Sequence, residues 1–397
     1  MQKNLKKCMG KIPGPLKSNH PPETIAVCMI VKNEESKIAD AINSVIPFAD
    51  EIIINDTGST DGTIEIIKEY QKIINNPPII LIQNPWEKSF SKARNQGLAK
   101  SRCQWNFWLD ADDKIEPGEA NKINTLKRAP LDRVFGFTIQ NTNQYGMPKA
   151  EFVQVRMFPN HPLLGFRRRI HEQILPAIAE LGLHLVYTDG KIIHTGYENE
   201  QYKKKKQHRN LELMGMEPDA NTDYMLLMAQ GDSNYILGEW EKGIDFFKKA
   251  YQIKNLDKIN LDAYLVIPSR IGAGFHGLGQ FKKAAEWYEI GYQRWPQNIE
   301  NCFTLGKCYE KLNEPEKALE YFNKVFELPK MITSQNLRYD QCRLYSFHNA
   351  TRLLMNMGRN RECLEILELM RNAYPDWELE SDDIIPTNQG TIVHDTI

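Results

Sequence analysis

The stretch Trp105-Asn-Phe-Trp-Leu-Asp-Ala-Asp-Asp113 joins an apolar run to three closely spaced carboxylates. Trp105–Leu109 has the composition of a short buried strand, and Asp110, Asp112 and Asp113 follow it directly. In parallel α/β sheets, ligands bind beyond the carboxyl ends of the strands, and Mg²⁺ and Mn²⁺ prefer carboxylate oxygens. The stretch therefore predicts a metal site at the edge of such a sheet, with an exposed acidic turn as the alternative.

Strand and helix patterns alternate on both sides of this stretch. Apolar runs predict strands at Thr24–Val31, Glu51–Ile54 and Ile79–Gln83. Apolar residues at helical spacing predict helices at Glu34–Val45, Thr63–Ile74 and Phe90–Ser101. Further strands are predicted at Val134–Gln140, Phe152–Phe158 and Leu185–His194. Strands separated by helices of this length predict a Rossmann-like α/β domain with a mainly parallel sheet.

The carboxyl-terminal half contains an internal repeat of seven residues. The four copies are Leu237-Gly-Glu-Trp-Glu-Lys-Gly243, Leu278-Gly-Gln-Phe-Lys-Lys-Ala284, Leu312-Asn-Glu-Pro-Glu-Lys-Ala318 and Met357-Gly-Arg-Asn-Arg-Glu-Cys363. The second and third copies begin 34 residues apart, which is the tetratricopeptide period, whereas the outer spacings are 41 and 45. We expect an all-α tetratricopeptide-like solenoid in which the small closing residue lets paired helices approach. Generic helical hairpins are the alternative.

Four motifs in order resemble the nucleotide-binding half of a GT-A fold glycosyltransferase of family 2. They are Val31-Lys-Asn-Glu34, Asp56-Thr-Gly-Ser-Thr-Asp-Gly-Thr63, Ala93-Arg-Asn95 and Leu109-Asp-Ala-Asp-Asp113. Together with the repeats, they resemble lipopolysaccharide-core glucosyltransferases and bacteriocin peptide S-glycosyltransferases. We expect a flexible arm over residues 1–21, a GT-A domain over 22–200, the solenoid over 205–380 and a tail over 381–397.

The resemblance implies roles for the acidic cluster. Asp112 is the expected ligand of a Mg²⁺ or Mn²⁺ ion that stabilises the departing diphosphate of the donor. Asp110 is expected to contact the ribose or to reach the metal through water. Asp113 is expected to orient acceptor or sugar groups.

The resemblance also implies contacts with the rest of the donor. Asp56 is expected to accept a hydrogen bond from the nucleobase, usually uracil, and Glu34 to lie beside the same nucleoside. Arg94 is expected near the diphosphate or the acidic loop, because a guanidinium matches phosphate geometry. Asp61 is read as a structural cap of the helix that begins near Thr63.

The acceptor side is expected in the second half of the domain, where Arg156 and Arg167–Arg169 precede Ile170-His171-Glu172-Gln173. Direct displacement needs a base to take the acceptor proton, and Glu172 is the candidate, with a structural carboxylate as the alternative. His171 is expected to touch the phosphates or orient Glu172. His194 is a candidate third metal ligand, although a histidine in such a place is more often structural.

These expectations combine into one function. The chain is expected to move a hexose from a nucleotide-sugar such as UDP-glucose to a peptide, protein or glycan acceptor, with inversion at the anomeric carbon. One alternative is a tetratricopeptide-type binding module with a degenerate transferase domain. A nucleotidyltransferase is a further alternative, but the first strand is followed by Lys32-Asn-Glu-Glu35 rather than by a glycine-rich phosphate loop.

Composition narrows the partners and the compartment. The 397 residues include 50 basic and 51 acidic residues, for a formal net charge of -1, so no global charge attracts nucleic acid. The seven cysteines form no CxxC pair, which favours free thiols in a reducing compartment. Neither a secretory signal nor a membrane-spanning run is apparent. We therefore expect a cytoplasmic enzyme whose repeats bind a protein partner or form a homodimer.

Overall fold

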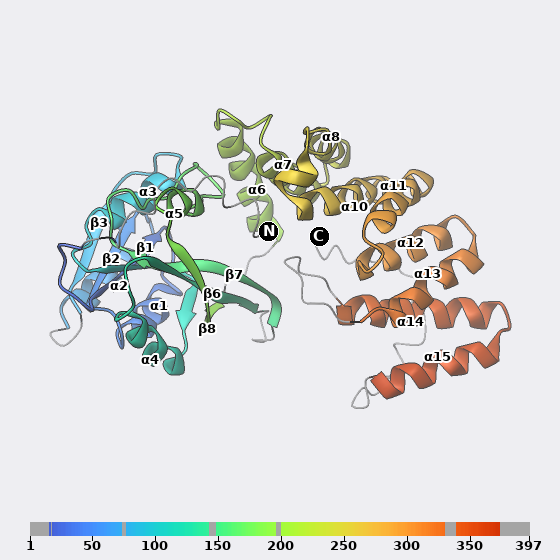
Figure 1. Ribbon diagram of the computed structural model, residues 1–397, viewed down its shortest axis with the longest axis horizontal. Helices are drawn as coiled ribbons and strands as arrows, with labels where there is room; N and C mark the ends of the chain where they lie inside the picture. Colours follow the sequence, from blue (N-terminus) through green and yellow to red (C-terminus); the bar gives the residue numbers. More distant parts are fainter. Residues whose placement is uncertain are drawn as a thin grey trace. The chain divides into compact units, whose positions relative to one another are not determined.

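The computed structural model describes residues 16, 18–73, 77–142, 148–195, 200–329 and 339–373. The chain divides into two compact units, Met1–Tyr202 and Lys203–Ile397, which are coloured from blue to red along the sequence in Figure 1. Most of the predicted arm and all of the predicted tail lie outside the described residues. The predicted fold class is confirmed, because an α/β unit is followed by a unit of helical hairpins.

The described part of the first unit contains one mixed sheet of eight strands, in the order β3-β2-β1-β4-β7-β6-β8-β5. The strands are β1 (Ile25–Val31), β2 (Glu51–Asp56), β3 (Ile79–Gln83), β4 (Trp105–Asp110), β5 (Asp113–Ile115), β6 (Arg133–Thr142), β7 (Pro148–Pro159) and β8 (His184–His194). β1, β2, β3 and β4 pair in parallel, as do β6 and β8. β7 pairs antiparallel with β4 and β6, and β5 pairs antiparallel with β8.

Helices cover both faces of this sheet. They are α1 (Ile38–Val45), α2 (Thr63–Gln71), α3 (Phe90–Leu98), α4 (Pro117–Leu126) and α5 (Leu175–Glu180). One apolar core holds residues of α1, α2 and α4, and another holds residues of α3 and α5, on opposite sides of the sheet in Figure 1. In β1, Val27 and Met29 point into the first core while Ala26 and Cys28 point into the second. A strand buried on both faces explains the unbroken apolar run that predicted it.

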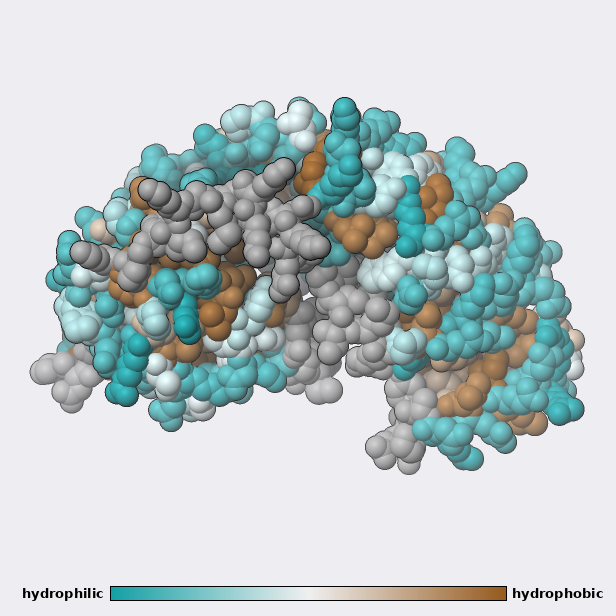
Figure 2. Space-filling model, viewed as in Figure 1, coloured by the Kyte–Doolittle hydropathy of each residue, from teal (hydrophilic) through white to brown (hydrophobic). Residues whose placement is uncertain are grey.

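The second unit consists of helical hairpins. Its helices are α6 (Glu200–Gly215), α7 (Tyr224–Ile236), α8 (Trp240–Tyr251), α9 (Leu256–Ile259), α10 (Leu261–Gly277), α11 (Phe281–Arg294), α12 (Ile299–Lys311), α13 (Pro315–Glu327), α14 (Tyr339–Asn356) and α15 (Asn360–Ala373). Each sequence repeat forms the turn of one hairpin, namely α7–α8, α10–α11, α12–α13 and α14–α15. The short helix α9 occupies part of the longer first spacing. In Figure 2 the hairpins show a mostly hydrophilic surface with scattered hydrophobic patches.

The second residue of each repeat has the left-handed backbone that ends a helix. The φ angles are +80° at Gly238, +70° at Gly279, +59° at Asn313 and +70° at Gly358. Glycine adopts this conformation without a steric penalty, and asparagine is the residue that most often replaces it. The repeated glycine or asparagine therefore reflects the left-handed backbone that each hairpin turn requires.

Small residues let the paired helices pack closely, as the repeats predict. A Cβ atom added to Gly243 on α8 would lie 2.2 Å from the ring of Tyr235 on α7. A Cβ atom on Gly306 of α12 would lie 2.5 Å from Phe322 of α13. Ala284 and Ala318, which close the second and third repeats, are fully buried.

Among the described residues, no helix combines the length and the apolar character that crossing a bilayer would require.

His276, near the carboxyl end of α10, should make the stability of the solenoid depend on pH. Burial, together with the charges of Lys307 and Lys311 on α12, lowers the pKa of this imidazole to about 4. Its Nε2 atom is buried without a hydrogen-bond partner in the described part of the chain. An unfolded histidine titrates near about 6.5, so the unfolded state takes up the proton first. We therefore expect the free energy of unfolding to fall as the pH drops from about 6.5 towards about 4.

The measurement is urea unfolding, followed by circular dichroism, across this pH range. Carboxylates elsewhere also lower stability in acid, so the comparison is with His276→Gln, which cannot take up the proton. The wild type should lose stability more steeply than the variant. Parallel pH profiles would show that His276 does not contribute.

Candidate active site

The ends of three neighbouring strands bring the predicted donor residues together. β1 lies between β2 and β4, and Val31 pairs with Asp56 on one side while Ile30 pairs with Asp110 on the other. Asp56 and Asp110 therefore lie at the same edge of the sheet, although 54 residues separate them in the sequence. This edge is where parallel α/β sheets bind their ligands.

Two loops at this edge are fastened to each other. The Asn33 Oδ1 atom accepts the backbone N–H of Thr60 at 2.7 Å, and the Ser59 hydroxyl accepts the N–H of Asn33 at 2.9 Å. The backbone N–H of Glu34 donates to the Thr63 hydroxyl at 2.8 Å. Asn33 has a φ of +58°, a left-handed conformation that asparagine tolerates. These bonds fix the loop after β1 and, with it, the position of Glu34.

Asp56 holds the turn after β2. Its carboxylate accepts the backbone N–H groups of Gly58 at 3.0 Å and Ser59 at 3.1 Å, and the residue is almost fully buried. A carboxylate has further lone pairs for a nucleobase N–H, so the predicted contact stays a proposal. Asp61 caps the start of α2 as predicted, accepting the N–H of Thr63 at 3.1 Å.

Arg94 on α3 links Asp110 to Glu172. Its Nη2 atom lies 2.8 Å from Asp110 Oδ1 and its Nε atom lies 2.7 Å from Glu172 Oε1. The guanidinium is 8% exposed and lies over the Trp108 ring, 4.1 Å from the ring centre. Arg94 and Glu172 are 78 residues apart in the sequence. Arg94 therefore contacts the acidic segment, as expected, and it also forms a hydrogen bond with Glu172, the predicted base.

Glu172 belongs to a short loop closed by two backbone hydrogen bonds between Arg167 and Gln173, each 3.0 Å long. Arg168 and His171 within it have positive φ angles of 75° and 49°. Such conformations cost free energy in residues other than glycine, so the surrounding structure holds this loop in place. The loop turns the half-buried Glu172 towards Arg94, whereas the neighbouring His171 side chain is exposed. The predicted contact of His171 with phosphates stays a prediction.

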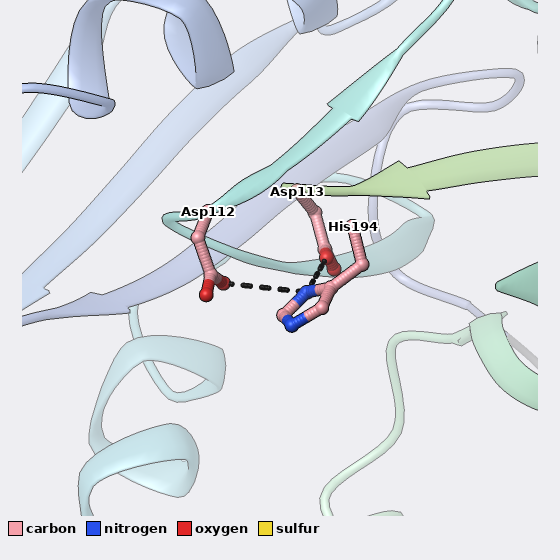
Figure 3. Close-up of side chains that lie close together, drawn as sticks. All are labelled: Asp112, Asp113 and His194. Atoms are coloured by element: carbon pink, nitrogen blue, oxygen red, sulfur yellow. Dashed lines mark hydrogen bonds and ion pairs between the residues drawn. The ribbon is translucent and has the colours of Figure 1, made fainter. Parts of the chain in front are cut away.

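Asp112, Asp113 and His194 form a second cluster, shown in Figure 3. β5 and β8 pair so that Asp113 lies opposite His194. The His194 Nδ1 atom lies 2.7 Å from Asp113 Oδ1 and 3.6 Å from Asp112 Oδ1. One ligand atom from each of the three residues lies within 4.8 Å of the others. A carboxylate of Asp112 beside an imidazole of His194 suits Mn²⁺ better than Mg²⁺, so these residues fit the predicted cation.

The three carboxylates have different partners. Asp110 is paired with Arg94 and Arg156, and despite burial these two arginines hold the pKa of Asp110 below its usual range. Asp112 pairs with no arginine among the described residues. Burial raises its pKa, and the charges of Asp110 and Asp113 add to the rise, while the nearby His194 opposes it. Burial and the nearby Asp112 likewise raise the pKa of Glu34 to about 7. A cation beside Asp112 would relieve this repulsion, whereas Asp110 is already neutralised.

Arg156 on β7 is a further residue of the site, whose role could not be predicted from the sequence. Its side chain is 2% exposed, and Nη2 lies 3.0 Å from Asp113 Oδ2 while Nη1 lies 3.5 Å from Asp110 Oδ2. The guanidinium lies 3.6 Å from the centre of the Trp108 ring. The only sequence signal was an arginine in a predicted strand, where an unpaired charge would be costly.

Asp113 is enclosed by other residues of the site. Its side chain is 0% exposed, and its oxygens contact His194, Arg156 and the backbone N–H of Asp110. The side chain lies between the imidazole and the buried arginine. The expected contact of Asp113 with acceptor or sugar groups stays a prediction.

With this geometry in view, comparison with known proteins assigns the first unit to a family. The family model described as Glycosyl transferase family 2 matches residues 26–175. The chain carries a family 2 glycosyl transferase domain. A Tetratricopeptide repeat model matches residues 299–328, which include α12 and α13.

Curated relatives share this domain. The SPbeta prophage-derived glycosyltransferase SunS of Bacillus subtilis (strain 168) is 28% identical over 246 residues, which cover 60% of this chain and 55% of the relative. The lipopolysaccharide core biosynthesis glycosyltransferase LpsC of Rhizobium meliloti (strain 1021) is 29% identical over 115 residues, 29% of this chain and 41% of the relative. The chain thus spans about half the length of the curated relatives that it matches.

A solved structure with some similarity is that of S. aureus TarS residues 1–349 in complex with UDP-GlcNAc. It is 13% identical, with a TM-score of 0.39, and the alignment covers 76% of this chain and 90% of that one.

Proposed function

We propose that this protein is a metal-dependent glycosyltransferase that moves a hexose from a nucleotide-sugar, such as a UDP-hexose, to an acceptor. The observation that carries the proposal is the unequal pairing of the acidic cluster. Asp110 is neutralised by two arginines, whereas Asp112 lies beside His194 and Asp113 and has a raised pKa. Such an arrangement leaves one carboxylate for a cation at the edge of the sheet where donors bind.

Asp112 and His194 would hold Mg²⁺ or Mn²⁺, which as a Lewis acid stabilises the negative charge of the leaving diphosphate. Asp56 and Glu34 would bind the nucleoside, since both lie in the interlocked loops after β1 and β2. Asp110 would contact the ribose. Arg94 keeps Asp110 in position and lies close enough to the site to add positive charge near the phosphates.

Glu172 is the proposed base. Its Oε1 atom is held by Arg94 at 2.7 Å and its side chain is 15% exposed, so it is positioned yet reachable. A fixed carboxylate can take the proton from an acceptor nucleophile while the bond to the leaving group breaks. A single displacement of this kind inverts the anomeric carbon.

The acceptor is proposed to be a peptide, a protein or a glycan. The solenoid supports a protein or peptide, because stacked hairpins present an extended surface for chains. The similarity to LpsC, a lipopolysaccharide core biosynthesis glycosyltransferase, supports a glycan acceptor. The same repeats would also serve a homodimer or a protein partner in the cytoplasm.

The experiment that tests the function has two stages. The purified protein is incubated with Mn²⁺ and, in turn, UDP-glucose, UDP-GlcNAc and GDP-mannose, and released nucleoside diphosphate is measured. The preferred donor, radiolabelled in the sugar, is then added to cell extract. Label in a protein band supports a protein acceptor, and label in lipid or glycan fractions supports a glycan. A folded protein that binds and turns over no donor would instead favour the binding-module alternative.

A further inference from the structure

We infer that Asp113 and Arg156 are positioning residues that orient the imidazole of His194 for the cation. This inference rests on the metal dependence proposed above. It assigns to Asp113 a role directed towards a neighbouring side chain, in place of a contact with substrate. It also gives a function to the buried Arg156, for which no contact with donor or acceptor is proposed above.

The backbone brings Asp113 and His194 together. β5 and β8 form three consecutive antiparallel residue pairs, the first of which is Asp113 with His194. Directly opposed residues in antiparallel strands present their side chains on the same face of the sheet. The 2.7 Å separation of Asp113 Oδ1 from His194 Nδ1 follows from this register. Figure 3 shows the two side chains facing each other at the end of the strand pair.

Asp113 is held from its other side by Arg156. Oδ2 lies 3.0 Å from Arg156 Nη2 and accepts the backbone N–H of Asp110 at 3.3 Å. Arg156 is itself fixed by the Trp108 ring and by the carbonyl oxygen of Trp108, which accepts from Nη1 at 3.4 Å. Oδ2 is therefore occupied by Arg156 and by the Asp110 N–H, and Oδ1 is left to accept a hydrogen bond from His194 Nδ1 at 2.7 Å. This contact requires a proton on Nδ1.

This choice of tautomer determines how the imidazole can act. With the proton on Nδ1, the lone pair of the ring lies on Nε2, the nitrogen that would then donate to the cation. Metal-binding histidines commonly donate their other ring N–H to a carboxylate, which fixes the ring and raises its basicity. Loss of such a partner typically weakens metal binding by roughly 10- to 100-fold. The structure supplies both the carboxylate and, in Arg156, the group that holds the carboxylate.

The test measures Mn²⁺ binding to the full chain without donor, by the electron paramagnetic resonance signal of free Mn²⁺. Asp113→Asn and Arg156→Lys should each bind Mn²⁺ roughly 10- to 100-fold more weakly than the wild type. The matched controls are Asp189→Asn on β8 and Arg167→Lys, whose side chains form ion pairs at the surface. Both controls should bind Mn²⁺ as the wild type does. Wild-type affinity in Asp113→Asn and Arg156→Lys would overturn the inference while leaving the proposed function standing.

A second measurement needs neither variant to fold. In protein labelled with ¹⁵N-histidine, His194→Asn identifies the His194 resonances. The inference predicts a protonated Nδ1 and, on addition of a little Mn²⁺, stronger relaxation at Nε2 than at Nδ1. A neutral ring with its proton on Nε2 and none on Nδ1, or stronger relaxation at Nδ1, would overturn it. A wild type that binds no Mn²⁺ would instead contradict the metal dependence proposed above.

Discussion

Replacing Asp112 with asparagine is expected to lower nucleotide-sugar turnover by about a thousandfold. In the part of the chain that the structure describes, Asp110 and Asp113 are paired with arginines and Asp112 is not, and Asp112 lies 3.6 Å from His194. Asparagine keeps the shape of the side chain but removes the charge that would attract the cation. The loss should appear mainly in the rate of transfer, because the charge on the diphosphate grows as the bond breaks.

The measurement is the release of nucleoside diphosphate from the preferred donor as a function of Mn²⁺ concentration. Asp189→Asn, an exposed aspartate on the same sheet, is the control and should leave the rate unchanged. High Mn²⁺ should restore only part of the activity of Asp112→Asn. A variant that turns over donor at the wild-type rate, at all Mn²⁺ concentrations, would place the metal elsewhere or remove it from the reaction.

Replacing Glu172 with glutamine is expected to slow transfer to the acceptor by roughly 10²- to 10⁴-fold, the range for loss of a general base. Glutamine can still accept the hydrogen bond from Arg94 Nε through its side-chain oxygen, so the loop and the arginine should stay in place. What it loses is the ability to take a proton. Donor binding should therefore be retained while transfer fails.

Two measurements separate these effects. Calorimetric titration with UDP and Mn²⁺ reports donor-site binding, and transfer of radiolabelled sugar to the identified acceptor reports catalysis. Glu180→Gln is the control, because Glu180 forms its ion pair with Arg167 at the surface. Loss of UDP binding in Glu172→Gln would indicate a structural carboxylate, the alternative that the sequence left open. Transfer at the wild-type rate would exclude Glu172 as the base.

The ion pairs of the proposed site explain why substitutions at Asp112 and Glu172 should have different effects from substitutions at the neighbouring arginines. Arg94 and Arg156 are both nearly buried and both lie against Trp108. They neutralise Asp110 and Asp113, and Arg94 also holds Glu172. Removing Arg94 would take the arginine partner from Glu172, and removing Arg156 would take it from the buried Asp113, which is destabilising. Substitutions at Asp112 and Glu172 remove the proposed metal ligand and the proposed base, and they leave both arginines in place.

Features that depend on neighbouring residues could be predicted from the sequence alone. β1, β2 and β4 follow from short, largely apolar runs, because a strand buried on both faces needs mainly apolar residues. β3, at the edge of the sheet, follows from the apolar run that begins at Ile79. The hairpin turns follow from Gly238, Gly279 and Gly358, whose left-handed backbone is local. The four donor motifs could likewise be recognised in the sequence, since three of them follow the ends of β1, β2 and β4 and the fourth lies within α3.

The ion pairs of the acidic residues depend on contacts between strands that are far apart in the sequence. β5 is three residues long, and nothing in its letters marks it as a strand. It forms because β8 returns beside it and places His194, 81 residues later, opposite Asp113. Arg156 reaches Asp110 and Asp113 because β7 pairs with β4. The three aspartates are close neighbours in the sequence, whereas ion pairs across the sheet distinguish Asp110 and Asp113, which contact arginines, from Asp112, which pairs with no arginine in the described part of the chain.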